Sequence, residues 1–274
     1  MNTLKLNNGV VMPQFGFGVW QVPDAEAAPA VAEALKAGYR SIDTAAAYGN
    51  EGGVGEAIAQ SDVDRDDVFI TTKLWNSDQG YDSTLRAFDE SLKKLKLDVL
   101  DLYLIHWPTP ARDLYVDTWK AFVQLQKEGR VRAIGVSNFQ PAHLRRLIDE
   151  TGVVPAVNQV ELHPYLQQSD LRVFHAQHGI ETEAWSPLGQ GGELLNDPVV
   201  TEIAARHQRS AAQVVLRWHV QLGTIVIPKS VTPARIRENI AVFDFELSDE
   251  EIAALSTLDR GGRIGPNPDE FNQA

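Results

Sequence analysis

The chain has 274 residues, and its 25 Lys and Arg against 37 Asp and Glu give a formal net charge of −12. This charge, without any Lys/Arg run, argues against binding to nucleic acid or to an anionic membrane surface. No stretch approaches the roughly 18 apolar residues of a membrane-spanning helix, and the first ten residues lack the apolar core of a signal peptide, so we expect a cytoplasmic protein. The absence of cysteine excludes disulfides, thiolate metal sites and a cysteine nucleophile.

Eight short β-rich runs alternate with helical patterns along the chain, which is typical of βαβ units and a parallel sheet. Most of these runs are apolar on both faces, as strands covered on both sides are. The runs are residues 14–20, 39–45, 68–74, 99–107, 132–138, 156–162, 180–186 and 224–230. This pattern predicts an α/β fold, an eight-stranded (β/α)8 TIM barrel that forms one domain over residues 1–274.

Helix signals fill the segments between the runs. Apolar residues recur every three or four positions, as in Leu85, Phe88, Leu92 and Leu95. Helix ends are predicted by four glycines that suit the left-handed residue after a last turn: Gly38, Gly129, Gly179 and Gly223. Helix starts are predicted by N-caps at Ser169, Ser210 and Thr232, by Pro141 and Pro233 at first helical positions, and by a capping box between Ser248 and Glu251.

The two ends of the chain differ from the repeating pattern. Residues 3–12 alternate around Asn8-Gly9, which predicts a β-hairpin with a two-residue turn. We expect this hairpin to close the barrel floor. Residues 260–274 have little apolar periodicity and are predicted to be loop.

Polar residues collect where the predicted strands end, and those ends build the active site of a parallel barrel. Asp43, Tyr48, Lys73 and His106 supply a carboxylate, a phenol, an ammonium and an imidazole from separate stretches of chain. Each alone has an ordinary structural explanation, such as a helix cap, a solvated rim lysine or a buried histidine with its hydrogen bonds made. Together they suit a proton donor for carbonyl reduction.

The phenol of Tyr48 ordinarily titrates near pH 10, which is high for a proton donor at neutral pH. An ammonium about 4 Å away contributes roughly 4 kcal/mol at an effective dielectric near 20, or about three pKa units. We therefore expect Lys73 to lower the pKa of Tyr48. Asp43 is expected to keep Lys73 protonated and to cancel part of that shift, and His106 to orient the substrate carbonyl.

Five stretches closely resemble the signature sequences of aldo-keto reductases, and among these the bacterial 2,5-diketo-D-gluconate reductase type is most similar. They are GYRSIDTAAAYGNE (38–51), LKKLKLDVLDLYLIHWP (92–108), IGVSNF (134–139), NQVELHP (158–164) and IPKSVTPARIREN (227–239). The resemblance implies a barrel that binds NADPH. It also implies that hydride passes from nicotinamide C4 to the carbonyl carbon, with Asp43, Tyr48, Lys73 and His106 as the catalytic tetrad.

The same resemblance implies further site residues. The cofactor-binding residues are Ser137, Asn138, Gln159, Trp185, Ser186, Leu188, Lys229, Ser230, Val231, Thr232, Arg235, Glu238 and Asn239. An aromatic substrate pocket is implied at Trp20, Trp75 and Trp107. Trp185 stands where many relatives have Tyr, a change that preserves stacking, and Pro233 also departs from many relatives.

Residues 229–235 indicate an anion site without reference to the family. Lys229 and Ser230 lead into a helix that opens at Thr232-Pro233, where backbone N–H groups and the helix dipole favour an anion, and Arg235 adds a second cation. Two cations in an acidic chain suggest a phosphate, which favours NADPH over NADH. The alternative is a solvated basic turn.

Two other functions compete with NADPH-dependent reduction of aldehydes, ketones and dicarbonyls to alcohols. One is a nucleotide-binding subunit of the same fold that is not catalytic, and the other is a cofactor-independent isomerase that uses Lys73 or His106.

The G-x-G of residues 16–18 lacks the third glycine of a Rossmann fingerprint. His175 and His178 lie three apart but have no carboxylate at metal-site spacing, so we expect no metal. We expect a monomer whose partner is a small carbonyl compound.

Overall fold

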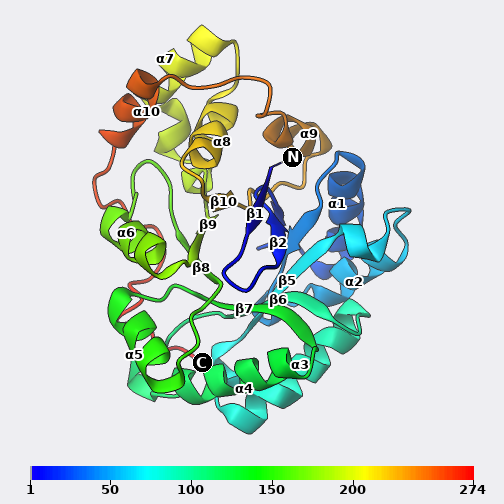
Figure 1. The fold of residues 1–274 in the computed structure, drawn as a ribbon. Coiled ribbons are helices and arrows are strands. Elements are labelled where there is room, and N and C mark those ends of the chain that lie inside the picture. Colours follow the sequence, from blue (N-terminus) through cyan, green and yellow to red (C-terminus); the bar gives the residue numbers. More distant parts are fainter. Residues whose placement is uncertain (1) are drawn as a thin grey trace.

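The computed structural model describes residues 2–274 and contains eight parallel strands ringed by helices (Figure 1). The strands follow one another around the sheet in chain order. They are β3 (Phe17–Gly18), β4 (Ser41–Asp43), β5 (Phe69–Leu74), β6 (Leu100–Ile105), β7 (Val131–Ser137), β8 (Val157–Glu161), β9 (Glu181–Trp185) and β10 (Ile225–Val226). Parallel bridges from Phe15 to Val226 and from Gly18 to Lys229 join the first strand to the last. The predicted (β/α)8 barrel is confirmed, and each predicted run overlaps one strand, although β7 begins one residue before its run.

Ten α-helices surround the sheet in the described part of the chain. They are α1 (Asp24–Lys36), α2 (Glu51–Ala59), α3 (Tyr81–Leu95), α4 (Tyr115–Lys127), α5 (Pro141–Thr151), α6 (Ser169–His178), α7 (Pro198–His207), α8 (Ala211–Gln221), α9 (Pro233–Ile240) and α10 (Asp249–Ser256). Helix α9 contacts α1, which closes the ring, while α7 and α10 contact each other at its periphery (Figure 1). Within residues 2–274, no helix is both long enough and apolar enough to span a membrane.

The helix boundaries follow the predicted signals with two exceptions. All four predicted stop glycines have left-handed backbone, with φ between 67° at Gly179 and 101° at Gly38. Ser210 and Ser248 form capping boxes, and Pro141 and Pro233 begin their helices. The exceptions concern two cap side chains. Thr232 occupies the N-cap of α9 without a side-chain capping bond. The N-cap prediction for Ser169 is wrong, because Gln168 takes that position with φ 46° and Ser169 is already helical.

An antiparallel hairpin of β1 (Thr3–Lys5) and β2 (Val11–Pro13) precedes the barrel. The predicted two-residue turn is wrong. Leu6 N–H donates to Val10 O at 2.8 Å, which leaves a three-residue loop whose last member, Gly9, has φ 90°. Such loops use a glycine in the left-handed region. Leu6 and Met12 are buried in a cluster with interior strand residues such as Leu102, which confirms that the hairpin closes the barrel floor.

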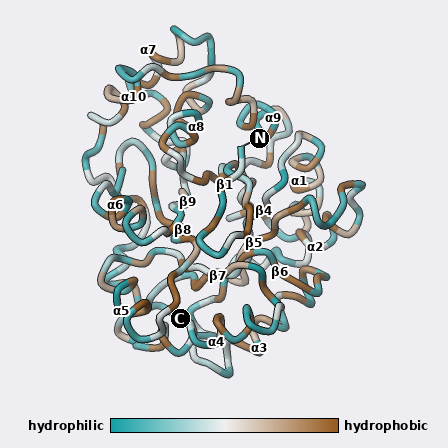
Figure 2. The backbone as a smooth tube through the Cα atoms, in the orientation of Figure 1, coloured by the Kyte–Doolittle hydropathy of each residue, from teal (hydrophilic) through white to brown (hydrophobic). Residues whose placement is uncertain are grey.

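The barrel wall is buried on both faces. Every residue of β4, β5, β6 and β8 is buried, as expected for parallel strands covered by helices. Figure 2 shows hydrophobic residues along the strands and hydrophilic residues on outer turns of the helices. Residues 257–274 contain no helix or strand, which confirms the predicted loop.

Candidate active site

One cavity of about 1320 Å³ opens at the carboxyl ends of the strands. Its wall includes every residue that the sequence predicted for the site except Lys73. Lys73 is fully buried in β5, beneath the wall, and it hydrogen-bonds to Asp43 and Tyr48, which line the cavity. The structure thus brings together the tetrad, the predicted cofactor residues and the three tryptophans.

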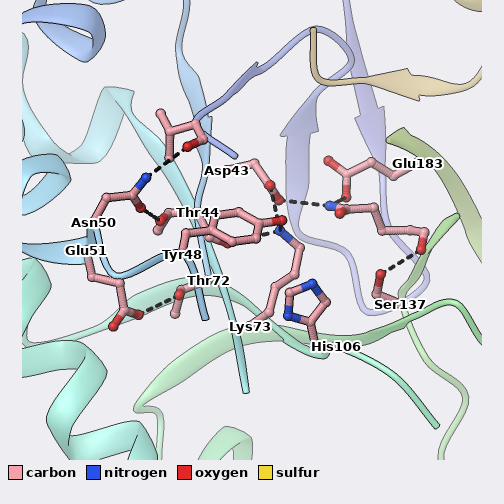
Figure 3. A network of polar contacts seen from close by, with 12 residues as sticks. Asp43, Thr44, Tyr48, Asn50, Glu51, Thr72, Lys73, His106, Ser137 and Glu183 are labelled. Carbon is pink, nitrogen blue, oxygen red and sulfur yellow. Dashed lines mark hydrogen bonds and ion pairs between the residues drawn. The ribbon is translucent and has the colours of Figure 1, made fainter. Parts of the chain in front are cut away.

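The four predicted tetrad residues form one group around the Lys73 ammonium (Figure 3). Lys73 Nζ donates to Asp43 Oδ1 at 2.6 Å, to Thr44 O at 3.0 Å and to Tyr48 Oη at 3.4 Å. The rings of Tyr48 and His106 meet edge to face with centroids 5.7 Å apart. Tyr48 lies on a 3-10 turn, Ala46–Tyr48, directly after β4, so the strand end and this turn aim the phenol at the ammonium.

Burial changes the expected titration of this group. Burial raises the pKa of Tyr48 more than the neighbouring Lys73 lowers it, so the pKa lies above its ordinary value of 10. The prediction of a lowered pKa is therefore wrong, because it counted the charge of Lys73 and not the desolvation of the phenolate. Burial also lowers the pKa of Lys73, but Asp43 and Tyr48 raise it by more. Lys73 is protonated, as predicted, and the proton of Tyr48 is held firmly at neutral pH.

His106 is a neutral imidazole. Burial, and then the charge of Lys73, lower its pKa well below 6.5. Its Nδ1 is buried and makes no hydrogen bond with the described residues, so Nε2 is the nitrogen available to an oxygen in the cavity. A neutral imidazole with a free nitrogen suits the predicted role of a hydrogen-bond donor to a carbonyl.

Polar side chains at the ends of β7, β8 and β9 form a second wall of the cavity. Asn138 Nδ2 donates to His106 O and Ser137 Oγ, and Asn138 Oδ1 accepts from Trp185 Nε1 at 2.8 Å. Ser137 Oγ donates to Gln159 O. Asn138 and Ser186 have φ of 63° and 48°, so the chain turns sharply where each strand ends. Such uncommon backbone is typical of functional sites.

A cationic edge lies where β10 leads into α9. Lys229 and Arg235 are exposed and line the cavity together with Ser230 and Thr232. In residues 2–274, neither cation makes an ion pair, whereas Arg237 in the same helix pairs with Glu33. Two unpaired cations at a helix start fit a phosphate group, since the exposed N–H groups add to their attraction.

Sequence reasoning missed two buried carboxyl groups. Glu183 lies on β9 and accepts a hydrogen bond from Gln159. Glu161, at the end of β8, accepts hydrogen bonds from the backbone of Ile264 and Gly265 and so holds the C-terminal tail at the cavity. The alternation of side chains in a strand places Glu183 on the same face as Trp185, which was an available signal for Glu183. The Glu161 contact spans 104 positions and had no local signal.

The sequence matches the profile of the Aldo/keto reductase family over residues 12–260. It is 61% identical to an aldo-keto reductase from Mycobacterium sp. (strain KMS) over 269 residues, 98% of this chain and 97% of that protein. It is 54% identical to methylglyoxal reductase DkgA from Escherichia coli (strain K12), again over 98% of this chain and 97% of that protein.

Solved structures agree with the sequence matches. A crystal structure of a Gox0644 mutant in complex with NADPH has a TM-score of 0.95 and 54% identity, covering 98% of each chain. The aldo/keto reductase from Brucella melitensis has a TM-score of 0.91 and 60% identity, covering 94% of this chain and 99% of that one. The chain therefore belongs to the aldo/keto reductase family.

Proposed function

We propose that this protein reduces small aldehydes and ketones to alcohols with NADPH, and that 2-oxoaldehydes such as methylglyoxal are its preferred substrates. The observation that carries the proposal is the gathering of Tyr48, His106 and the buried Asp43–Lys73 pair at one cavity that also holds a cationic helix start. The substrate class is supported by relatives named methylglyoxal reductase that are 53% to 55% identical to this chain.

Tyr48 is the proton donor in this proposal. Its raised pKa keeps the phenol protonated at neutral pH, so a proton is available when negative charge develops on the carbonyl oxygen. Lys73, 3.4 Å from Tyr48 Oη, stabilises the phenolate left behind, and Asp43 holds Lys73 protonated and in place. Neutral His106 donates from Nε2 to the same oxygen and orients the carbonyl.

The residues of the cavity fit NADPH, which supplies the hydride when bound. Lys229, Ser230 and Arg235 would hold the phosphate next to the ribose, and Gln159 would bind the carboxamide. The proposal gives the remaining cofactor contacts to Ser137, Asn138, Trp185, Ser186, Leu188, Val231, Thr232, Glu238 and Asn239, all of which line the cavity. The phosphate assignment is supported by Lys229 and Arg235, which make no ion pair with any residue that the structure describes.

The substrate end of the cavity is walled by aromatic and tail residues. Trp20, Trp75 and Trp107 line it together with Ile264, and the ring of Phe271 packs against Trp107 with centroids 4.5 Å apart. This wall lies beside His106, whose ring meets that of Trp75 edge to face. An apolar wall close to the proton donor favours compact carbonyl compounds over long or highly charged ones.

The test follows oxidation of NADPH, with NADH alongside, by purified protein with methylglyoxal, an aromatic aldehyde and a diketo sugar acid. We expect carbonyl-dependent oxidation that prefers NADPH and has the highest kcat/KM for methylglyoxal. A higher value for the sugar acid would overturn the substrate class. Nucleotide binding without turnover of any carbonyl would support the non-catalytic subunit instead.

We also propose a domain organisation, an oligomeric state and a cellular location for the protein. The chain acts as a single domain over residues 1–274, as a monomer and in the cytoplasm, without nucleic acid or membrane as partners. The acidic charge of −12 and a hydrophobic core that runs continuously from Phe15 to Leu255 support this view. Sedimentation equilibrium at assay concentrations tests the monomer, and a mass of twice 30.3 kDa would contradict it.

A further inference from the structure

Glu183 lies beneath the candidate site rather than in it. It is fully buried on β9, two positions before Trp185, and does not line the cavity. Figure 3 shows the carboxyl groups of Glu183 and Asp43 turned toward each other. The group that joins them is the side-chain amide of Gln159, which donates to Asp43 Oδ2 at 2.8 Å and to Glu183 Oε2 at 2.9 Å.

These two hydrogen bonds determine which way the Gln159 amide faces. Both N–H groups of Nε2 are used by carboxyl oxygens, and a reversed amide would place Oε1 against two acceptors. Oε1 therefore points away from Asp43 and Glu183. It makes no hydrogen bond with the described residues, and Gln159 lines the cavity. Gln159 thus presents an acceptor to a ligand in the cavity.

The neighbouring polar atoms have protein partners instead. Both N–H groups of Asn138 and its Oδ1 are used within the protein, and Ser137 Oγ donates to Gln159 O. Of the side chains of Ser137, Asn138 and Gln159, only that of Gln159 has an acceptor oxygen that no group in residues 2–274 uses. An acceptor of this kind distinguishes a carboxamide, which has an NH2 group, from a group of the same shape that has none.

Burial of the Glu183 carboxyl group in this place costs folding free energy. Burial raises the pKa of Glu183 to about 8, and the charge of Asp43 contributes in the same direction. Its second oxygen, Oε1, is buried and makes no hydrogen bond with the described residues. Since a protonated carboxyl still has an acceptor oxygen, Glu183 accepts from Gln159 in either state. A buried carboxyl group that is only partly satisfied needs a reason to be kept, and the hydrogen bond to Gln159 supplies one.

We propose that Glu183 is a positioning residue for cofactor recognition: by accepting the second N–H of Gln159, it fixes that amide so that Oε1 accepts from the NH2 group of the nicotinamide carboxamide. The inference rests on the proposed assignment of Gln159 to the carboxamide. Its consequence is a preference for the natural carboxamide over an acetyl group at the same ring position, without any contact between Glu183 and the cofactor.

The test measures binding of NADP+ and of its 3-acetylpyridine analogue by quenching of tryptophan fluorescence. In the unaltered protein we expect NADP+ to bind about tenfold more tightly, which corresponds to about 1.4 kcal/mol. Glu183→Met keeps the length of the side chain and removes the acceptor, so the preference should fall to about twofold or less through weaker NADP+ binding. Glu183→Gln retains an acceptor and should restore the preference.

Two further variants separate positioning from general destabilisation. Glu183→Asp withdraws the carboxyl by one methylene group, keeps a polar side chain in the barrel and should lose the preference even if the Met variant fails to fold. Val160→Ala, at a buried apolar position of β8, should lower Tm and leave the preference unchanged. Retention of the preference in the Met or Asp variant would overturn the role of Glu183. No preference in the unaltered protein would overturn the Gln159 assignment instead, while leaving NADPH-dependent reduction intact.

Discussion

The buried Glu161 carboxylate accepts a 2.8 Å hydrogen bond from the backbone N–H of Gly265, 104 positions further along the chain. The preceding N–H, of Ile264, donates to the other oxygen at 2.6 Å, and His163 Nε2 lies 3.0 Å from that same oxygen. Gly265 is also pressed against Trp185, since a Cβ on Gly265 would lie 2.5 Å from Cη2 of the ring. One carboxylate therefore places both the tail and the wall of the cavity.

We expect Glu161→Gln to release the tail from the cavity. One backbone N–H would then face the Gln amide NH2 instead of an acceptor, and a buried donor without a partner costs about 1–3 kcal/mol. KM for methylglyoxal should rise about tenfold. The kcat/KM for bulkier ketones should increase relative to that for methylglyoxal. Hydrogen exchange at residues 264–265 should quicken in the same variant.

The matched control is Glu193→Gln, which breaks the exposed ion pair with Arg260 of the same tail. Exposed pairs contribute roughly 0–1 kcal/mol, so this variant should keep its substrate preference. Equal effects of the two variants would contradict the special importance of the buried carboxylate.

Tyr48→Phe should lower kcat for carbonyl reduction by about 10² or more, the usual contribution of a general acid. The affinity for NADPH should stay within about twofold, because the ring and its packing against His106 remain. In the unaltered protein, the raised pKa of Tyr48 predicts that ionisation of the phenol reduces kcat only above about pH 10. Steady-state kinetics and fluorescence titration measure both quantities. The exposed Tyr81→Phe serves as the control, and near-normal turnover of the Tyr48 variant would exclude the phenol as the donor.

Replacement of both Lys229 and Arg235 by Gln should weaken NADPH binding by about 100-fold and NADH binding by less than about threefold. A hydrogen bond to a charged group contributes about 1.5–3 kcal/mol, and only NADPH has the additional phosphate. Dissociation constants for both nucleotides provide the measurement. Arg237→Gln, in the same helix but already paired with Glu33, should change neither. Equal losses of affinity for NADPH and NADH would contradict the assignment of Lys229 and Arg235 to the additional phosphate.

Two buried histidines should make the fold less stable in acid. Burial lowers the pKa of both His175 and His219 to about 3, and both rings hydrogen-bond as neutral groups. The unfolded chain binds their protons near pH 6.5, so stability is full above that pH and falls as the pH drops toward 3. Each histidine should remove up to about 1.4 kcal/mol per pH unit.

Urea unfolding at pH 8, 6.5 and 5 measures this dependence on pH. His219→Gln should lower the free energy of unfolding at pH 8 and make it less dependent on pH between 6.5 and 5. If the His219 variant lost stability toward acid as steeply as the unaltered protein, buried His219 would not be a source of the acid sensitivity.

The fold and most of the site could be predicted because their signals are local. Runs apolar on both faces identify covered strands, and the carboxyl ends of parallel strands must meet at one rim, so Asp43, Lys73 and His106 could be placed together. Glu183 was missed because the prediction considered strand ends, and Glu183 lies one layer below. The tail contact of Glu161 depends on tertiary packing alone. Whether the pKa of Tyr48 is raised or lowered depends on burial, which the sequence does not specify.

The barrel closes where its two shortest strands meet: β3 and β10 contribute only two residues each and are joined through the Gly18–Lys229 bridge. Gly18 and Lys229 also line the cavity that we assign to the nucleotide. A nucleotide bound there would contact both edges of the sheet, and its binding free energy would oppose their separation. We therefore expect occupancy of the cofactor site to slow local opening of the barrel and to raise the resistance of this fold to proteolysis.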